Sequence, residues 1–365
     1  MDLTSAIEVA QEIEDNSYDQ VVDTNDIDIH IAGVDDTHRL YYSTPRNGST
    51  GSTCWPMSAT AERQTAQSCG IPFRYWEQSL ASDPEFLRGQ IQHWFRTAPK
   101  SRLLRIVAPV TQKASDKFDS PYIRAFVSDK YQPFRNSQLL QQLADSDEAS
   151  ECFSTEHLWQ AYVDEERLAF GCNHPKLTAS IEGSRLDGGS EVNDIVKGGL
   201  RLLNSEVGDG MLSLGFSIFR LVCKNGMVAP GDFWGYRRRH VGSTHAPGAI
   251  ADFENPSDVV AHLQKSLQAL TSDALFDSLV AQISGSTKIQ VREDWVARLA
   301  KRFASISKAE RDSIAQNFER DHDTSLWGAT NAITYAAHDA SQVRAQQLQS
   351  IGGEVLARPR NLVAH

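Results

Sequence analysis

The sequence predicts an α+β fold: an antiparallel β-meander packed with helices, followed by a helical C-terminal third. Runs of β-favouring residues fill the middle of the chain and are separated by Gly, Asp and Asn turns. Amphipathic helical patterns fill the part after residue 255. Because strands and helices are grouped along the chain and do not alternate as β-α-β units, a doubly wound parallel sheet is not expected.

We expect three regions along the chain. An acidic N-terminal arm and hairpin take residues 1–50, a mixed α+β core takes residues 51–255, and a helical region takes residues 256–365. Hydrophobic residues make up 40% and charged residues 23% of the 365 residues, which is ordinary for a globular protein. The N-terminus lacks the basic and apolar stretches of a signal peptide, and no apolar run is long enough for a transmembrane helix. We therefore expect a cytoplasmic protein with no membrane partner.

The negative charge of the chain is concentrated at its start. The chain has 36 Lys and Arg residues against 47 Asp and Glu residues, for a formal net charge of -11. Residues 1–36 hold eleven of these acids and no Lys or Arg, so the rest of the chain is neutral overall and a nucleic-acid partner is not excluded. We interpret this segment either as a solvated tail or as an arm that covers a basic groove or recruits a basic partner.

Short elements with clear boundaries are expected in the first half of the chain. Residues 27–31 alternate in polarity and residues 39–42 favour extended structure, which predicts a hairpin. A Gly-, Ser- and Thr-rich loop follows at residues 47–53. Gly70 then predicts the end of a helix over residues 58–68. The remaining elements are a helix over residues 83–95, with Trp94 and Phe95 on its apolar side, and strands over residues 103–109 and 122–127.

The meander is expected over residues 176–245. Asn225-Gly226 lies between two apolar runs, and this dipeptide is the strongest short-range signal for a hairpin because both residues tolerate positive φ. Asn225 and Gly226 are therefore expected to shape a hairpin tip. The expected strands cover residues 176–182, 199–206, 212–224 and 236–242.

Four helices are expected in the last third. Asn255-Pro256-Ser257 predicts the start of a long helix that runs to about residue 284. Ser307 and Glu310 have the spacing of a capping box, which predicts a helix from there to about residue 320. The other two helices are expected over residues 291–305 and 327–347.

The sequence shows no motif for catalysis, nucleotide binding or metal binding. Gly208-Asp209-Gly210 does not continue as a dinucleotide fingerprint, and no phosphate-binding loop is present. The five cysteines form no C-x-x-C pair. Asp321-His322-Asp323 is interpreted as a helix cap and turn and not as a metal site. We therefore expect no catalytic residue, no metal and no cofactor.

Aromatic and basic residues are interleaved in two segments. Residues 91–140 hold nine bases and three acids, and residues 211–250 hold five bases and one acid. Cations along the backbone and aromatic faces that stack on bases are how proteins hold a single nucleic-acid strand. The alternative is half-buried strands whose aromatic residues belong to the core and whose arginines extend into the solvent. The candidate nucleic-acid-binding residues are Arg124, Lys130, Arg135, Arg237, Arg238 and Arg239 for phosphate groups, and Tyr131, Trp234 and Tyr236 for base stacking.

Several segments, in their order along the chain, are similar to one family of proteins. They are residues 70–76 (GIPFRYW), 124–131 (RAFVSDKY), 204–208 (NSEVG), 220–227 (RLVCKNGM) and 331–334 (NAIT), together with Ser58, Ala61 and Trp327. In these segments the chain resembles the phage/plasmid-like protein family of domain of unknown function 932, over about residues 57–340. The resemblance implies an origin on a mobile genetic element and supplies no activity or catalytic residue. By analogy of architecture alone, the expected fold is similar to the core of phage single-strand-annealing proteins.

The leading hypothesis is a phage or plasmid DNA-metabolism protein that binds single-stranded DNA without catalysis and promotes strand annealing or protects the strand. We expect a homo-oligomer, because repetition of a short groove multiplies its affinity. The alternative is a protein-interaction or DNA-mimic module that acts through the acidic arm and binds no nucleic acid. An unrecognised hydrolase that uses residues 321–323 is a third hypothesis.

Overall fold

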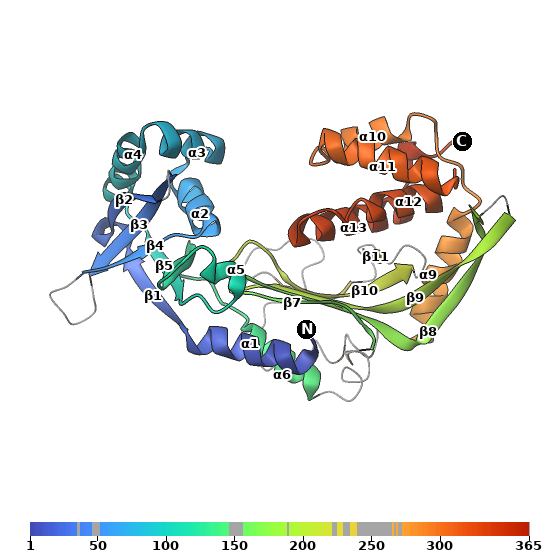
Figure 1. The fold of residues 1–365 in the computed structure, drawn as a ribbon, viewed down its shortest axis with the longest axis horizontal. Helices are drawn as coiled ribbons and strands as arrows, with labels where there is room; N and C mark the ends of the chain where they lie inside the picture. Colours follow the sequence, from blue (N-terminus) through green and yellow to red (C-terminus); the bar gives the residue numbers. More distant parts are fainter. Residues whose placement is uncertain are drawn as a thin grey trace.

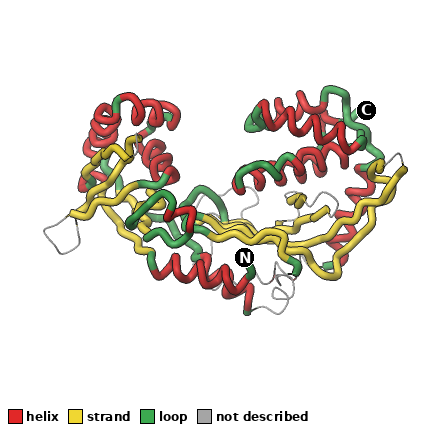
Figure 2. The backbone as a smooth tube through the Cα atoms, in the orientation of Figure 1, coloured by secondary structure: helices red, strands yellow, loops and turns green. Residues whose placement is uncertain are grey.

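The computed structural model shows two lobes on the same side of a long curved β-sheet (Figures 1 and 2). Residues 17–128 form the N-terminal lobe, residues 273–364 form the C-terminal lobe, and residues 158–238 form the sheet between them, which we call the floor sheet. This arrangement confirms the predicted α+β class with helices in the C-terminal part. The structure describes residues 1–34, 37–45, 52–145, 156–187, 190–220, 225–228, 234–238, 265, 268 and 272–364.

Two three-stranded antiparallel sheets form the N-terminal lobe. The order in the first sheet is β1-β5-β6 and in the second β2-β3-β4. The predicted hairpin over residues 27–42 is confirmed as strands β2 and β3, whose register pairs Ile31 with Leu40. The strands are β1 (Ser17–Asp23), β2 (Asp28–Val34), β3 (Thr37–Pro45), β4 (Ser52–Pro56), β5 (Ser101–Val107) and β6 (Tyr122–Ser128).

Helices α2 (Ala59–Cys69), α3 (Phe73–Ser82), α4 (Pro84–Thr97) and α5 (Gln112–Ser115) complete this lobe. The predicted start and end of α2 are confirmed. Ser58 accepts a hydrogen bond from the Ala61 amide, and Gly70 closes the helix with a φ of 70°, which only glycine adopts freely. The prediction for α4 is half wrong, because Phe95 is buried but Trp94 is 46% exposed. Phe95 lies on the buried face of the helix, and Trp94, one residue earlier, is rotated away from it.

The acidic N-terminal segment belongs to the folded body and is not a tail. Helix α1 (Leu3–Asp15) buries Ala6, Ala10 and Ile13 and packs against α6 (Asn136–Ala144) below the floor sheet. Strand β1 then pairs with β5 along its whole length. Glu8, Glu12 and Asp15 of α1 are exposed, whereas Glu14 faces α6, so the helix is amphipathic. Strand β3, before the predicted boundary at residue 50, pairs with β4, after it, and the predicted boundary at residue 255 lies outside the described residues.

The meander predicted over residues 176–245 is confirmed as part of the floor sheet, which starts earlier, at residue 158; residues 239–245 lie outside the described residues. The strand order is β11-β10-β9-β8-β7, and β12 pairs with β10. The prediction for the hairpin tip of the meander is wrong. Asn225 and Gly226 pair with Arg220 and Phe219 within the sheet, so they lie in strand β11 and not at a hairpin tip. The strands are β7 (Leu158–Val163), β8 (Arg167–Asp187), β9 (Ser190–Ser205), β10 (Leu212–Arg220), β11 (Asn225–Val228) and β12 (Trp234–Arg238).

The two faces of the floor sheet differ in character. One face presents large apolar side chains such as Phe170, Leu202 and Phe216 to a core that includes residues of α1, α6 and α9. Side chains alternate between the two faces of a strand, so the residues between these apolar ones point to the other face, and they are smaller or polar. Its central rows are Ala169, Leu203 and Ser213, then Gly171, Arg201 and Gly215.

The C-terminal lobe is a bundle of helices. The predicted capping box is confirmed at the start of α11, where Ser307 and Glu310 exchange hydrogen bonds. The single helix predicted over residues 327–347 is wrong: α12 ends at Tyr335, and α13 begins after Ser341, whose extended backbone suits an N-cap. The predicted start of a helix at residue 255 lies outside the described residues. The helices are α9 (Asp273–Ser286), α10 (Trp295–Arg302), α11 (Lys308–Asp321), α12 (Leu326–Tyr335) and α13 (Gln342–Ala357).

No helix in the described part of the chain has the length and apolar character needed to cross a membrane.

Candidate functional site

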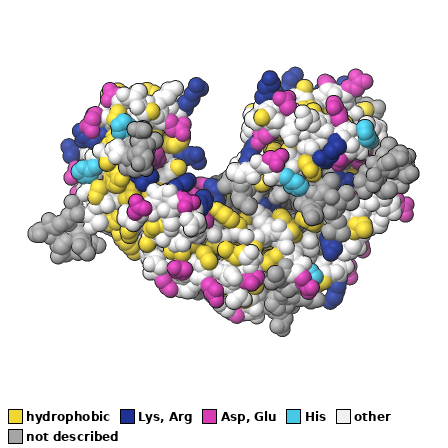
Figure 3. Space-filling model, in the orientation of Figure 1, with side chains coloured by type: hydrophobic (Ala, Val, Ile, Leu, Met, Phe, Trp, Pro, Cys, Tyr) yellow, Lys and Arg dark blue, Asp and Glu magenta, His cyan; other side chains and the backbone are white. Residues whose placement is uncertain are grey.

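A groove of about 1160 Å³ lies between the two lobes. Its floor is the polar face of the floor sheet, one wall comes from β3, α2 and α5, and the other wall comes from α13 and the loop after α10. Figure 3 shows the molecule deeply hollowed between the lobes, with Lys and Arg side chains beside the opening. A concave site of this size, assembled from segments distant in sequence, is a typical place for ligand binding.

The N-terminal wall and the adjoining floor of the groove are rich in cations. Arg39 is half-buried and Arg63, Lys113 and Lys117 are exposed, and Arg167 from β8 adds a fifth cation at the floor. The Arg39 guanidinium lies over the Phe118 ring, 5.1 Å from its centroid, and Arg63 lies over another aromatic ring of the same lobe. Arg39, Arg63, Lys113 and Lys117 share one wall because β3, α2 and the segment around α5 all line this side of the groove.

Two carboxylates of the groove have partners within the fold. Lys113 donates to Asp164 Oδ2 at 2.5 Å and, although burial alone would raise it, this contact holds the pKa of Asp164 below its usual value. Glu165 accepts from the backbone amides of Val110 and Thr111 at 2.9 and 2.7 Å, and from the Thr111 hydroxyl at 2.7 Å. Glu165 thus fixes the start of α5 and with it the position of Lys113.

Two further groove carboxylates are held by arginines. Asp209 pairs with Arg167, and Glu354 of α13 pairs with Arg302 at 2.7 Å. These contacts reduce the negative field in the groove, since each carboxylate faces a cation within its own wall.

Burial raises the pKa of the remaining two carboxylates of the groove. The pKa of Glu62 is raised to about 7, and the neighbouring Asp164 adds to the rise for Glu166. Glu166 accepts a hydrogen bond from the Thr60 hydroxyl at 3.2 Å. A carboxyl group with a raised pKa is partly protonated near neutral pH, so Glu62 repels an anionic ligand less than an exposed glutamate would.

The C-terminal wall of the groove is mostly uncharged but polar. Its hydroxyl and amide groups come from Ser305, Ser341, Gln346, Gln347 and Ser350. Such groups both donate and accept hydrogen bonds. A ligand in the groove would therefore meet cations on one side and neutral hydrogen-bonding groups on the other.

Aromatic rings also line the groove on its N-terminal side. Phe118 and Tyr122 are stacked with ring centroids 3.9 Å apart, and both rings are largely buried. Tyr162 of β7 is half-buried, and the centroid of its ring lies 5.8 Å from Lys113 Nζ. Tyr162 is the more accessible of these rings for stacking against a planar ligand group.

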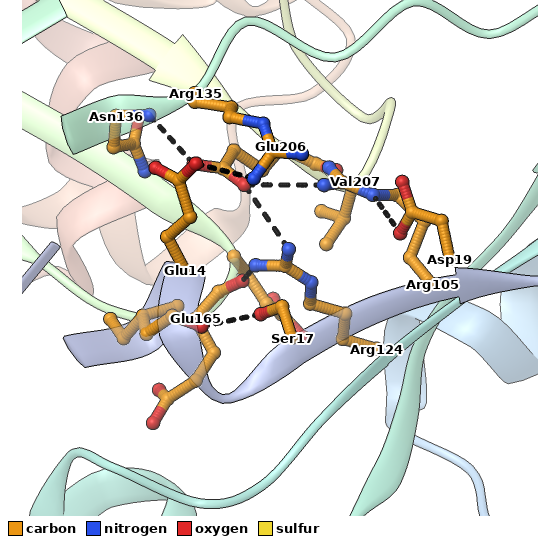
Figure 4. A network of polar contacts seen from close by, with 12 residues as sticks. Glu14, Ser17, Asp19, Arg105, Arg124, Arg135, Asn136, Glu165, Glu206 and Val207 are labelled. Atoms are coloured by element: carbon orange, nitrogen blue, oxygen red, sulfur yellow. Dashed lines mark hydrogen bonds and ion pairs between the residues drawn. The ribbon is translucent and has the colours of Figure 1, made fainter. Parts of the chain in front are cut away.

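A buried ion network fixes the N-terminal lobe to the floor sheet (Figure 4). Glu206, which follows β9, accepts from Arg124 Nη2 at 3.1 Å and lies 3.4 Å from Arg105 Nη2. Arg124 Nη1 donates to the Glu165 carbonyl at 2.6 Å, and Arg105 Nε donates to Asp19 at 3.0 Å. Both arginine side chains are at most 3% exposed. The network positions Glu165, and so the wall that Glu165 supports.

The location of Arg124 corrects the prediction that it binds a phosphate group. Its side chain is 1% exposed and belongs to the buried network with Glu206. Tyr131 was predicted to stack on a base, but it is 5% exposed and its hydroxyl donates to the Ser205 carbonyl at 3.1 Å. Both side chains are buried at the junction between the N-terminal lobe and the floor sheet. A nucleic-acid strand in solution cannot reach them there.

Lys130 and Arg135 are exposed, as the sequence prediction requires, but they do not line the groove. Arg135 pairs with Glu14 at the junction of α1 and α6, below the floor sheet. An acid of the N-terminal segment thus pairs with a base of the segment at residues 91–140. The structure does not bring Lys130 and Arg135 together with the groove cations.

Four of the other candidate residues lie in strand β12. Trp234, Tyr236, Arg237 and Arg238 pair through their backbones with residues 212–215 of β10. Strand β12 therefore belongs to the floor sheet, next to the strand that carries Ser213 of the groove. Arg239 lies outside the described residues.

The sequence prediction missed the cations that line the groove. Lys113 and Lys117 lie within the basic segment at residues 91–140, so its charge was a usable signal for them. Arg39, Arg63 and Arg167 lie in three separate segments with no local excess of positive charge. Only the packing of the lobes brings them to one groove.

A family model described as "Domain of unknown function (DUF932)" matches residues 125–355, which is more than half of the chain. The matched part contains the floor sheet and most of α13, and therefore the floor and the C-terminal wall of the groove. No curated protein and no solved structure matches the chain.

Proposed function

The chain belongs to the DUF932 family, whose domain has no known function, and we propose that it binds single-stranded nucleic acid in the groove between its lobes, without catalysis. The observation that carries the proposal is the asymmetry of the groove: five cations lie on the N-terminal wall and floor, together with carboxylates that have partners or a raised pKa, and hydroxyl and amide groups lie on the other wall. Cations suit the phosphate backbone, and neutral donors and acceptors suit the edges of unpaired bases.

The proposal replaces most of the residues predicted from sequence. Phosphate groups would contact Arg39, Arg63 and Lys117, and Tyr162 would stack on a base. Lys113 and Arg167 are less available because each is already paired with a carboxylate of the groove. Strand annealing or protection, a homo-oligomer, a cytoplasmic location and an origin on a mobile element stay predictions.

The first test removes the groove cations that form no ion pair with a carboxylate of the groove. The triple variant Arg39→Ala, Arg63→Ala and Lys117→Ala is expected to bind labelled oligo-dT about 10–100-fold more weakly at low salt than the wild type. The dependence of log affinity on log salt concentration should become shallower by about 2, because fewer counterions are released per strand. Fluorescence anisotropy at several salt concentrations measures both quantities.

A matched control removes exposed cations outside the groove. The double variant Lys130→Ala and Arg135→Ala is expected to keep the affinity and salt dependence of the wild type within about twofold. If this control loses affinity and the triple variant does not, the surface predicted from sequence is the binding site and the groove is not.

The alternative, a protein partner of the acidic segment, also stays a prediction. Deleting residues 1–36 does not test it cleanly, because this deletion also removes α1 and the strand that pairs with β5.

A further inference from the structure

Arg201 is a fully buried cation with no described carboxylate in contact. It lies on β9 at 0% exposure, and its Nη1 donates to the side-chain oxygen of Gln349 on α13. Its Nε and Nη2 have no hydrogen-bond partner. Burial lowers the pKa of Arg201 to about 9.

This arrangement is costly for the protein on its own. A buried charged group is normally paired with an opposite charge, and a buried donor without a partner loses the hydrogen bonds it would make with water. The other buried arginines of the described region follow the rule, since Arg105, Arg124 and Arg220 each contact a carboxylate. Arg201 departs from it.

The residue in contact with the Arg201 guanidinium also holds a donor without a partner. The guanidinium lies over the face of the Trp159 ring, 5.5 Å from its centroid, and Trp159 Nε1 is buried with no hydrogen-bond partner. Gly171 is opposite Arg201 in the sheet, and a Cβ at this position would lie 2.4 Å from Trp159 Cζ2. The glycine therefore makes room for the indole next to the guanidinium.

Arg201 points to the same face of the floor sheet as Leu203, the neighbouring residue on that face of β9, which lines the groove. Leu203, two residues along β9, lines the groove, and residues two apart on a strand point to the same face. Gln349 belongs to α13, where the adjacent Ser350 lines the opposite wall. Arg201 and its Gln349 partner are therefore buried between the floor sheet and α13, next to residues that line the groove but not among them.

We propose that Arg201 and Trp159 Nε1 form an anion site that takes a phosphate group entering from the groove. The amide of Gln349 would release Arg201 Nη1, and the phosphate oxygens would accept hydrogen bonds from the guanidinium and the indole, as charge-assisted bonds that a neutral amide cannot match. Any phosphate group could make these hydrogen bonds. That the phosphate belongs to a nucleic-acid strand rests on the proposed function, whereas the anion site itself does not.

The first experiment uses the full chain and inorganic phosphate as the probe. Thermal unfolding should show a saturable rise in Tm of the wild type with phosphate, relative to chloride at equal ionic strength. Arg201→Met should lose this rise, whereas Arg135→Met, which removes an exposed arginine, should keep it. Without phosphate, Arg201→Met should melt about 2–4 °C above the wild type, because the variant removes an unpaired buried charge.

A second variant keeps the test decisive if Arg201→Met does not fold. Gln349→Glu places a carboxylate on the contact that Arg201 already makes, so it should raise Tm without phosphate and abolish the response to phosphate. The inference is overturned if the wild type shows no response to phosphate, or if the folded variants respond as the wild type does.

Oligo-dT distinguishes this inference from the proposed function. If both hold, Arg201→Met should bind oligo-dT about tenfold or more weakly than the wild type. If phosphate raises Tm through Arg201 but oligo-dT does not bind, the anion site stands and the nucleic-acid proposal fails. If the wild type and Arg201→Met bind oligo-dT equally well, the phosphate bound by Arg201 does not come from a nucleic-acid strand.

Discussion

Glu206→Ala is expected to lower the free energy of unfolding by about 3–5 kcal/mol, because it leaves two buried guanidinium groups without their shared carboxylate. Glu206 contacts Arg124 and Arg105, and its Oε1 accepts from the Asn136 amide at 2.7 Å. Although burial alone would raise it, the two arginines hold the pKa of Glu206 below its usual value. The carboxylate therefore stabilises the folded state in its charged form.

Urea unfolding of the wild type and the variant measures this effect. Glu85→Ala is the matched control, because Glu85 pairs with Arg88 on the surface and its loss should cost at most about 1 kcal/mol. The variant Glu206→Gln removes the charge of the side chain but keeps its shape, so it shows how much of the lost stability is due to the charge. A depressed pKa gives stability that is present above the unfolded-state pKa, so the difference between wild type and Glu206→Gln should shrink as the pH falls below about 4. Equal costs for the Glu206 and Glu85 variants would contradict the account of the network.

Asp194→Ala is expected to have an effect of similar size, about 3–5 kcal/mol, at the other end of the floor sheet. Asp194 is 0% exposed and accepts two hydrogen bonds from Arg220, from Nε at 2.7 Å and from Nη2 at 2.9 Å. It also accepts from Trp327 Nε1 of α12 at 3.1 Å. These contacts join the floor sheet to the C-terminal lobe, which carries one wall of the groove.

Hydrogen exchange followed by mass spectrometry locates the effect of Asp194→Ala. Peptides from α12 and α13 should exchange faster than in the wild type, while those of α2 and α4 in the other lobe should change less. Asp294→Ala is the control, since Asp294 pairs with Arg298 on the surface of the same lobe. Unchanged exchange in α12 after loss of Asp194 would show that this contact does not join the sheet to the lobe.

Elements with local signals could be predicted from the sequence. The hairpin of β2 and β3, the caps of α2 and the capping box of α11 depend on residues within a few positions of each other. The family was also recognised from short segments, and the family model confirms it over residues 125–355. Local chemistry therefore predicted the fold class and the boundaries of these few elements.

The candidate site could not be predicted in the same way. Arg124 and Tyr131 look like exposed strand residues in the sequence, but Arg124 pairs with Glu206, 82 positions away. The groove cations likewise come from β3, α2, α5 and β8, which meet only in the folded chain. The acidic N-terminus looked like a tail because its charge hides the buried face of α1, which consists of small apolar residues such as Ala6 and Ala10.

Photo-cross-linking tests most directly whether a nucleic-acid strand lies in the groove. Oligo-dT that carries 4-thiothymidine is irradiated with the full chain, and tryptic peptides joined to nucleotide are identified by mass spectrometry. We expect cross-links on the peptide of residues 118–124, which contains Phe118 and Tyr122, and on the peptide that contains Tyr162. The account is contradicted if no peptide is cross-linked, or if cross-links are confined to peptides away from the groove, such as residues 131–135.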